Sequence, residues 1–175
     1  MSRLVLVRHG EAAARWNEDT DPGLSERGRQ QAAALSYGLG KLAPMLIVTS
    51  PLRRARETAA PLAAHWGVEP VVDAAVGEVP SPTDDLAGRM AWLASVLSTP
   101  FEDWPTDLQA WRQSVVAALC ALPTEAVVFT HYVFITVAAG VAGFRPDHCS
   151  QTVVSVDDGR LSLVSLGTEA DTVVR

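Results

Sequence analysis

The sequence is poor in cysteine, and its cysteines form no recognisable pattern. Two occur in 175 residues, Cys120 and Cys149, and they lack the Cys-x-x-Cys spacing of a metal site. Small secreted domains that depend on disulfides contain many more. The two cysteines therefore predict buried, reduced thiols, as in a cytoplasmic protein.

Positive charge is also scarce. Lysine and arginine total 14 against 20 for aspartate and glutamate, which gives a formal net charge of -6. Such a surface repels nucleic acid and anionic membranes, so we expect neither as a partner. Any site for an anion must then be a local positive pocket.

Long hydrophobic runs are rare. The apolar run after Arg3 is a few residues long and ends at Arg8, so no signal peptide is expected. Residues 126–143 are nearly continuously apolar and long enough to raise the question of a membrane span. His131 would lie near the middle of that span at high cost. We therefore interpret the stretch as a buried strand followed by a buried helix, and expect no membrane association.

The sequence contains no internal repeat, low-complexity segment or domain linker, and its 48% hydrophobic content excludes a disordered protein. The length suits one full hydrophobic core. Residues 1–175 are therefore predicted to form a single domain, in which residues 79–105 are a short, lid-like insertion.

The order of the hydrophobic segments predicts an α/β fold. Continuous aliphatic runs, typical of strands buried on both faces, occur at 3–8, 45–49, 68–72 and 127–130. Helices are expected at 25–39, from Ser50-Pro51 to Gly67, and at 83–97, 106–122 and 133–142. Residues 151–156 and 160–166 flank an Asp-Gly pair and predict a β-hairpin. Together these elements predict a three-layer α/β/α sandwich with a mostly parallel central sheet.

The first predicted strand breaks abruptly into Arg8, His9 and Gly10. In open α/β sheets ligands bind at the carboxyl ends of the strands, because the loops diverge there. Gly10 allows a tight turn or a close approach to a ligand, which keeps the imidazole and the guanidinium near the floor of that crevice. A cation beside a potential nucleophile indicates an anionic substrate.

Four segments in the same order resemble the histidine phosphatase superfamily, the phosphoglycerate-mutase-like proteins. Residues 8–10 (RHG) resemble the family signature, and residues 24–28 (LSERG) resemble the start of the first helix. Residues 50–59 (SPLRRARETA) resemble the second phosphate-binding segment, and residues 127–131 (VVFTH) a strand that ends in the family's second histidine. The resemblance implies a phosphoglycerate-mutase-like version of the predicted fold.

The resemblance also implies roles for particular residues. His9 would be the nucleophile that becomes a phosphohistidine, which requires a neutral imidazole. Arg8 and Arg54 would clamp the phosphoryl oxygens. His131 would complete the phosphate cage and stabilise charge on the transferring group. Asn17 matches a neutral phosphate donor of many family members, although an asparagine in a loop is commonly a turn residue.

Glu78 is the candidate general acid. It would protonate the departing alkoxide and later activate the water that hydrolyses phosphohistidine. Both tasks need a carboxyl group whose pKa is raised by burial or by the phosphate dianion. Its position after the third predicted strand favours it over Asp73, Asp84 and Asp85.

Two positions depart from the family pattern. Ala12 stands where a serine or threonine often follows the first motif, and Tyr132 stands where a glycine often follows the second histidine. Neither change removes a charged catalytic group. Tyr132 could narrow the range of substrates or simply fill the core.

Other chemistry is less well supported. His9, Glu11, His131 and His148 are possible metal ligands, but they lack the His-x-x-x-His spacing of the usual zinc motifs, and two arginines would repel a cation. We therefore expect neither a metal nor another cofactor. Residues 38–41 (GLGK) lack the spacing of a Walker loop and are better interpreted as the end of a helix.

The predicted function is a metal-independent phosphatase for small phosphorylated molecules. A phosphoglycerate-type mutase must protect its phosphorylated intermediate from water, which in the resembling mutases goes with longer insertions than residues 79–105. Protein phosphohistidine phosphatases of the superfamily usually lack the loop glutamate, so Glu78 favours small molecules. A phospholigand-binding pseudoenzyme is the non-enzyme alternative. The sequence leaves the oligomeric state open.

Overall fold

The computed structural model describes residues 1–15, 18–83 and 85–170 of the chain. Its centre is a six-stranded sheet with the strand order β3-β2-β4-β1-β5-β6. The strands are β1 (Ser2–Arg8), β2 (Leu46–Thr49), β3 (Val71–Val72), β4 (Ala126–Thr130), β5 (Gln151–Asp157) and β6 (Arg160–Ser165). The α-helices are α1 (Glu26–Leu39), α2 (Arg53–Trp66), α3 (Leu86–Ser98), α4 (Thr106–Cys120) and α5 (Tyr132–Ala139). Two short 3₁₀ helices are η1 (Ala74–Val76) and η2 (Phe101–Asp103).

One part of the sheet is parallel and the other is an antiparallel edge. β1 and β2 both pair with β4 in parallel, and β3 pairs with β2 in the same sense. β5 runs antiparallel to β1, and β6 runs antiparallel to β5. Asp158 and Gly159 turn between β5 and β6 with φ values of 46° and 69°, the left-handed backbone of a two-residue hairpin turn. The predicted hairpin and the mostly parallel sheet are confirmed.

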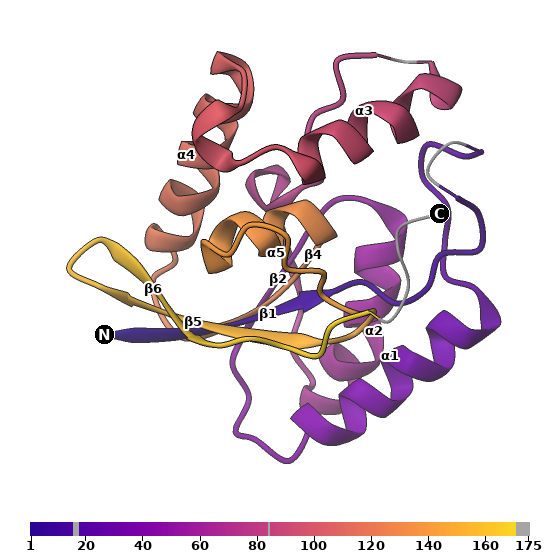
Figure 1. Ribbon diagram of the computed structural model, residues 1–175. Coiled ribbons are helices and arrows are strands. Elements are labelled where there is room, and N and C mark those ends of the chain that lie inside the picture. The colour runs from indigo at the N-terminus through magenta and orange to yellow at the C-terminus, as the bar shows by residue number, and fades with distance from the viewer. Residues whose placement is uncertain (16–17, 84, 171–175) are drawn as a thin grey trace.

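Helices cover both faces of the sheet because the strands are apolar on both faces. In β1, Leu4 and Leu6 join a buried cluster with residues of α4 and α5, whereas Val5 and Val7 join a second cluster with residues of α1 and α2. Figure 1 shows α1 and α2 on one side of the strands and α4 and α5 on the other. The predicted three-layer α/β/α architecture is confirmed.

The third strand is shorter than predicted. Residues 68–72 were expected to form it, but β3 contains Val71–Val72 alone, and both side chains are about half exposed. Pro70 precedes them and has no N–H to donate to a neighbouring strand. The aliphatic run therefore yields a short edge strand instead of a buried one.

The second helix begins later than predicted. It starts at Arg53 and not at Ser50-Pro51. The backbone N–H of Ser50 still donates to the carbonyl of Phe129 at 3.0 Å, which continues the course of β2 beyond its last residue. Leu52 is extended as well, with φ −67° and ψ 139°. This delay leaves Ser50 at the edge of the sheet, facing the end of β4.

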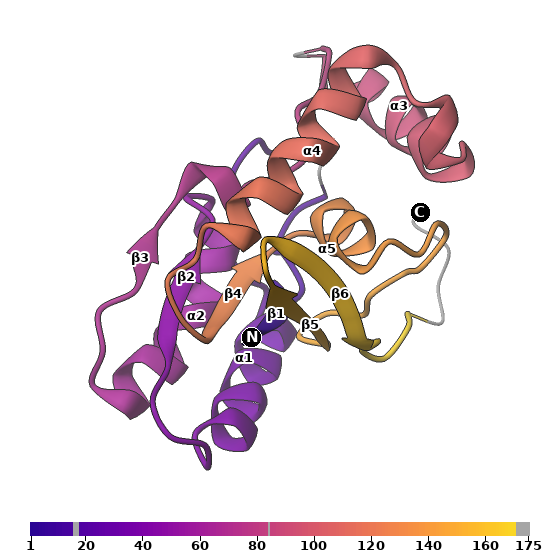
Figure 2. The same ribbon diagram turned by 90° about the vertical axis from the view of Figure 1, so that its left-hand side faces the viewer.

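The segment 79–105 lies at the periphery of the helical layer. Figure 2 shows α3 beside α4 and away from the strands. Val96, Phe101 and Trp104 are buried and hold the segment against the cluster beneath α4 and α5. The indole N–H of Trp104 is close to the carbonyl oxygens of Val96 and Thr99, at 3.2 and 3.1 Å. The predicted helix at 83–97 is present, starting at Leu86.

The apolar stretch 126–143 forms β4 and the eight-residue helix α5, as predicted. Across the described residues, every helix is too short or too polar to cross a membrane.

Candidate active site

Three strand ends meet at one edge of the sheet and bring distant residues together. The N–H of His9, just after β1, donates to the carbonyl of Thr130 in β4 at 3.1 Å. Ser50, just after β2, makes the corresponding bond to Phe129. His131 follows β4 directly. The side chains of His9, Ser50 and His131 therefore start from neighbouring positions, as expected at the carboxyl ends of parallel strands.

His9 is buried and held in one tautomer. Its Nδ1 lies 2.7 Å from the carbonyl oxygen of Gly10. Because a carbonyl oxygen only accepts, Nδ1 carries the proton and Nε2 carries the lone pair. Arg54 Nε donates to that Nε2 at 3.2 Å. Burial, followed by the charges of His131, Arg54 and Arg8, holds the pKa of His9 well below its ordinary value, so the ring is neutral.

The loop that carries His9 is packed too tightly for side chains at two glycines. A Cβ on Gly10 would lie 2.7 Å from the carbonyl oxygen of Gly28, and a Cβ on Gly28 would lie 2.1 Å from that of Glu11. Ser25, the predicted N-cap of α1, accepts from Gly28 N–H and donates its hydroxyl to Glu11. Gly10 N–H donates to Thr58 Oγ1 of α2 at 2.9 Å. The first motif is thus fixed by both α1 and α2.

Glu78, whose side chain is 20% exposed, joins the buried side chains of Arg54 and His131 in one network. One oxygen of its carboxylate, Oε2, accepts from Arg54 Nη2 at 2.9 Å and lies 3.2 Å from His131 Nδ1. The other ring nitrogen of His131 is 2.7 Å from Ser50 Oγ. Burial raises the pKa of Glu78, but the stronger combined effect of His131 and Arg54 lowers it to about 2. Glu78 is therefore a carboxylate in the free protein.

The segment before Glu78 is tied to two strand ends. Thr130 at the end of β4 donates its hydroxyl to the carbonyl of Val76 at 2.7 Å. Asp73 N–H donates to the carbonyl of Thr49, the last residue of β2. The short helix η1 between these contacts carries the chain from the edge of the sheet to Glu78, so the predicted loop glutamate reaches the other strand-end residues.

Arg8 and Arg54 each keep one buried donor without a partner inside the described protein. The Nη1 of Arg8 donates to the carbonyl of Pro146 at 2.9 Å, but its Nε is buried and unpaired. Arg54 is 3% exposed, and its Nη1 is also buried and unpaired. Burial lowers the pKa of Arg8 and outweighs the opposing charge of Glu78. Both residues line the same cavity, and an anion bound there would offset the cost of holding two guanidinium groups with incomplete hydrogen bonding.

A metal ion fits this arrangement poorly. Ligand atoms of His9, Glu78 and His131 lie within 4.8 Å of one another, close enough to hold a cation. The guanidinium of Arg54, however, donates to both His9 and Glu78. A cation among these atoms would meet a permanent positive charge and would compete with it for the same lone pairs.

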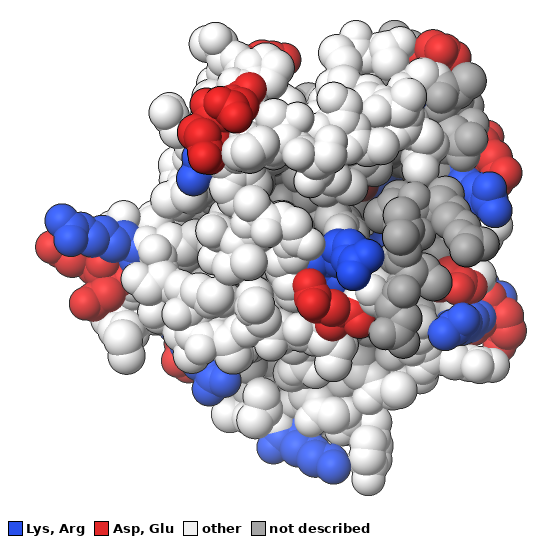
Figure 3. Space-filling view, in the orientation of Figure 1, with Lys and Arg blue, Asp and Glu red and all other residues white. Residues whose placement is uncertain are grey.

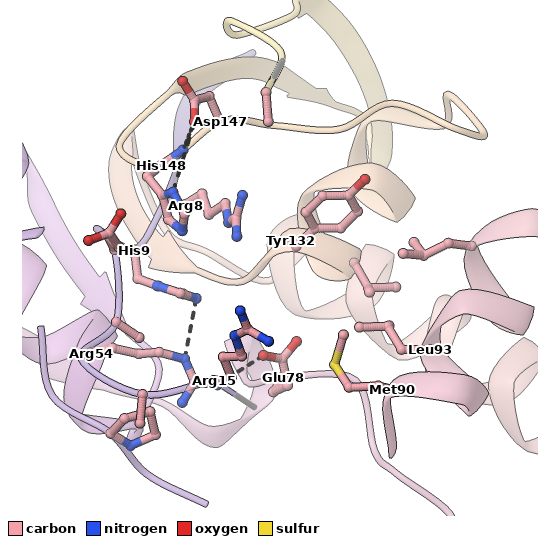
Figure 4. A pocket seen from close by; sticks show the side chains of 17 residues that line it. Arg8, His9, Arg15, Arg54, Glu78, Met90, Leu93, Tyr132, Asp147 and His148 are labelled. Carbon is pink, nitrogen blue, oxygen red and sulfur yellow. Dashed lines mark hydrogen bonds and ion pairs between the residues drawn. The ribbon is translucent and has the colours of Figure 1, made fainter. Parts of the chain in front are cut away.

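The cavity above this network has a volume of about 510 Å³. Figure 4 shows His9, Arg8 and Arg54 on one side, Met90 and Leu93 of α3 on the other, and Glu78 between them. On the face that Figure 3 displays, the charged side chains of the described residues lie in small, separate groups and form no broad basic patch. The positive charge that would receive an anion is therefore local, as the acidic composition predicts.

The structure brings most of the predicted site residues together. Arg8, His9, Arg54 and Glu78 line the cavity, and so does Tyr132, whose ring lies 5.2 Å from the guanidinium carbon of Arg8. His131 does not line it. Its side chain is fully buried and reaches the site through Glu78 and through the His9 ring, whose centroid is 5.2 Å away.

Asn17, the predicted neutral phosphate donor, lies outside the described residues. Ala12 lines the cavity near the motif, where the family often has a hydroxyl group.

Several lining residues could not be recognised as site residues from the sequence. They are Arg15, Met90, Leu93, Leu97, Val133, Asp147 and His148. His148 is the best placed of them, since its ring centroid lies 6.0 Å from that of His9. Burial, and then the charge of Arg8, lower the pKa of His148 to about 4. The sequence offered His148 as a possible metal ligand only, because a single histidine in a loop indicates no partner.

The chain is similar to known proteins in sequence and in fold. The family model described as histidine phosphatase superfamily (branch 1) matches residues 4–169. Glucosyl-3-phosphoglycerate phosphatase of Mycobacterium tuberculosis is 34% identical over 139 residues, covering 70% of this chain and 62% of that protein. Phosphoserine phosphatase 1 of Hydrogenobacter thermophilus is 30% identical over 115 residues, covering 63% of this chain and 51% of that protein. The chain thus matches less than two thirds of the length of either relative.

Solved structures share the whole fold. A protein described as mycobacterial hydrolase 1 is similar with a TM-score of 0.72 and 27% identity, covering 97% of this chain and 99% of that chain. The native structure of mycobacterial glucosyl-3-phosphoglycerate phosphatase gives a TM-score of 0.70 and 28% identity, with 97% and 100% covered. With the family model matching almost from end to end, the chain belongs to the histidine phosphatase superfamily, branch 1.

Proposed function

We propose that the protein is a metal-independent phosphatase that hydrolyses phosphate monoesters of small molecules through a phosphohistidine at His9. One observation carries this proposal. His9, a neutral and buried imidazole whose Nε2 accepts from Arg54, lines a cavity together with Arg8 and Arg54, and each of these arginines has one buried donor without a partner among the described residues. A phosphoryl group is the anion that uses both features, because its oxygens accept from guanidinium donors while its phosphorus accepts a nucleophile.

The first step transfers the phosphoryl group to the protein. His9 Nε2 attacks phosphorus, the bond between phosphorus and the ester oxygen breaks, and Glu78 gives its proton to the departing alkoxide. In the second step Glu78, now a carboxylate, takes a proton from water as that water attacks phosphorus. The phosphorus–nitrogen bond breaks, inorganic phosphate leaves, and His9 returns to its neutral form.

The low pKa of Glu78 in the free protein must change when substrate binds. Arg54 and His131 hold it at about 2, whereas a general acid needs a proton to give. A phosphate dianion would draw Arg54 toward itself and place negative charge beside the carboxylate, and both effects raise the pKa of Glu78. In this proposal the substrate itself prepares the acid.

Arg8, Arg54 and His131 would stabilise charge on the transferring phosphoryl group. Arg54 already contacts the nucleophile and the acid, at 3.2 and 2.9 Å, so it positions both while it binds phosphate. The Oγ of Ser50 lies 2.7 Å from Nε2 of His131, the ring nitrogen that does not face Glu78, and so orients the ring. Asn17 stays a predicted phosphate donor.

The relatives support small phosphorylated molecules as substrates. Their names specify glucosyl-3-phosphoglycerate and phosphoserine. The α3 segment adds one wall to an open cavity, which suits hydrolysis better than a mutase cycle that excludes water. The two free cysteines favour a cytoplasmic location.

Hydrolysis of p-nitrophenyl phosphate in the presence of a chelator tests the proposal. We expect turnover to continue without metal, and alkaline quenching during turnover to trap label from ³²P-substrate on His9 as a base-stable adduct that acid then releases. Turnover that stops with chelator and returns with a divalent metal would contradict it. Tight phosphate binding without any turnover would instead favour the pseudoenzyme.

A further inference from the structure

The α3 side of the cavity is apolar. Met90, Leu93 and Leu97 of α3 line it, and their spacing of three and four residues places them on one face of the helix. Val133 of α5 extends the same wall. All four lining residues are hydrocarbon or thioether side chains, and none of them can hydrogen-bond a hydroxyl or charged group of a substrate strongly.

The cavity lining includes none of the polar residues of α3. Arg89 is the one charged residue in the sequence of α3, and its Nε donates to the carbonyl of Thr83. Ser98 donates to the carbonyl of Ser95, inside the helix. Neither of these residues lines the cavity. A substrate group that reaches α3 therefore exchanges water for apolar contacts.

The proposed mechanism determines which part of the substrate reaches this wall. Displacement at phosphorus places the attacking nitrogen and the leaving oxygen roughly in line. Because the proposed mechanism has Glu78 protonate the leaving oxygen, that oxygen must also lie next to Glu78. Figure 4 shows Glu78 between His9 on one side and Met90 and Leu93 on the other. The carbon skeleton of the leaving alcohol would then continue past Glu78 to α3.

We propose that the protein prefers phosphate monoesters of apolar alcohols, with an alkyl or aryl group packed against Met90, Leu93 and Leu97. This proposal rests on the proposed function. Burying hydrocarbon is favourable in proportion to area, so each added methylene that reaches the wall should raise kcat/KM by roughly two- to fourfold until the wall is covered.

A carboxylate-bearing ester is the rival substrate, and Arg15 would be the group to bind it. Arg15 lines the cavity, but it is exposed to solvent. Ion pairs in water contribute little because solvation competes with them. Contacts between the α3 wall and hydrocarbon are not weakened by solvation in this way. We therefore assign the main part of substrate specificity to α3.

The test is the kcat/KM of the full chain on ethyl, butyl and hexyl phosphate, with phosphoserine as the carboxylated comparison. The proposal expects a steady rise from ethyl to hexyl phosphate and a lower value for phosphoserine than for butyl phosphate. Equal values along the series would overturn it. Higher activity on phosphoserine that Arg15→Gln abolishes would also overturn it and would assign specificity to Arg15.

Substitutions locate the effect. Leu93→Ala should reduce the hexyl-to-ethyl ratio of kcat/KM by about fivefold or more, and Met90→Ala should act in the same direction if Leu93→Ala folds poorly. Leu163→Ala is the matched control, since Leu163 is a partly exposed leucine of β6 that does not line the cavity. It should keep the native ratio. Unchanged ratios in both α3 variants would overturn the proposal.

Failure of the inference is distinguishable from failure of the proposed function. If hydrolysis depends on His9 but does not change with the length of the alkyl chain, the proposed function is supported and the apolar preference is wrong. If no ester is hydrolysed in a way that depends on His9, both the proposed function and the apolar preference are wrong.

Discussion

The strand-end wall of the cavity and its α3 wall are built by different means. His9, Arg54 and Glu78 come from three separate segments and are joined by hydrogen bonds of 2.9 and 3.2 Å among buried or partly buried groups. The α3 wall comes from one helix, and Met90 and Leu93 meet the cavity through apolar atoms that are partly exposed. Each group of the first wall depends on the others, whereas each residue of the second acts almost alone.

This contrast indicates how the two walls respond to change. Groups that act as a unit show large, non-additive losses when one is removed. Separate apolar contacts are worth a modest amount each and add up. We therefore expect substitutions at the strand ends to cause large losses of catalytic activity. Substitutions in α3 should change the preference among substrates by a modest factor each.

His9→Ala should give the largest effect. Removing the nucleophile should reduce kcat on p-nitrophenyl phosphate by about 10⁴-fold or more, whereas Leu93→Ala should reduce it by no more than about tenfold. The same assay measures both. Calorimetric titration with inorganic phosphate should still show binding to His9→Ala, because Arg8 and Arg54 remain.

Leu163→Ala serves as the control for both variants, since it removes a leucine far from the cavity lining. If His9→Ala lost no more activity than Leu93→Ala, the two walls would not differ in kind, and the assignment of chemistry to the strand ends would be wrong.

Glu78→Gln should give the next largest effect, and it should depend on the leaving group. Alkoxides are poor leaving groups and need a proton, so kcat/KM for butyl phosphate, which reports transfer of the phosphoryl group to His9, should fall by about 10²- to 10³-fold. A nitrophenolate leaves without help, so kcat/KM for p-nitrophenyl phosphate should fall by less than about tenfold, whereas kcat, which includes the water attack shared by both substrates, should fall for both. Glu125→Gln, which changes an exposed glutamate just before β4, should leave both rates at the native value. Equal losses of kcat/KM on the two substrates would exclude Glu78 as the acid.

Gly28→Ala tests whether the strand-end wall depends on the packing behind it. A methyl group there would lie 2.1 Å from the carbonyl oxygen of Glu11, so the loop that carries His9 must move. We expect a loss of about 2 kcal/mol in the free energy of unfolding and a fall in kcat/KM of up to about 10²-fold from misplacement of His9.

Gly38 provides a matched control in the same helix. It is exposed, and a methyl group there would meet no atom within 4 Å. Gly38→Ala should therefore stabilise the protein by about 0.5–1 kcal/mol in urea unfolding and keep native activity. A similar result for both substitutions would show that the contact between Gly28 and Glu11 does not position the loop.

Much of the fold could be predicted because its signals are local. The aliphatic run of β1 ending at Arg8, the N-cap Ser25 and the turn at Asp158-Gly159 each depend on a few neighbouring residues, and each is found as predicted. The prediction of a longer β3 was wrong, because Pro70 limits pairing more than the surrounding aliphatic residues favour it.

The site was harder to predict, because its contacts join distant parts of the chain. The resemblance brought Arg8, His9 and Arg54 to one place, but the hydrogen bond from Arg54 to His9 spans 45 residues and carries no sequence signal. The lowered pKa of Glu78 is likewise a property of the assembled network. The α3 wall escaped prediction for another reason. Apolar residues three and four apart on a helix usually indicate core, so the pattern does not distinguish a cavity wall from packing.

The pH dependence of stability should arise on the strand-end side alone. His148 has a pKa of about 4 in the folded protein and an ordinary value of about 6.5 when unfolded. Between these values the unfolded state binds more protons, so stability falls as the pH falls. His148→Asn removes this effect. From pH 7 to pH 4.5, the variant should lose about 2 kcal/mol less than the native protein in urea unfolding.

The comparison of unfolding free energies ends at pH 4.5 because protonation of Glu78 also contributes below that pH. The folded pKa of Glu78 is about 2, so its contribution is lost only as the pH falls from the ordinary carboxyl value of about 4.3 toward 2. His9 has a lowered pKa too, but it is present in both proteins and cancels in the comparison. Since α3 contains no histidine and no acidic residue, Leu93→Ala should keep the native pH slope. If the free energy of unfolding changed with pH in the same way for His148→Asn and the native protein, His148 would have the same pKa in the folded and unfolded states. It would then make no electrostatic contribution to the strand-end wall.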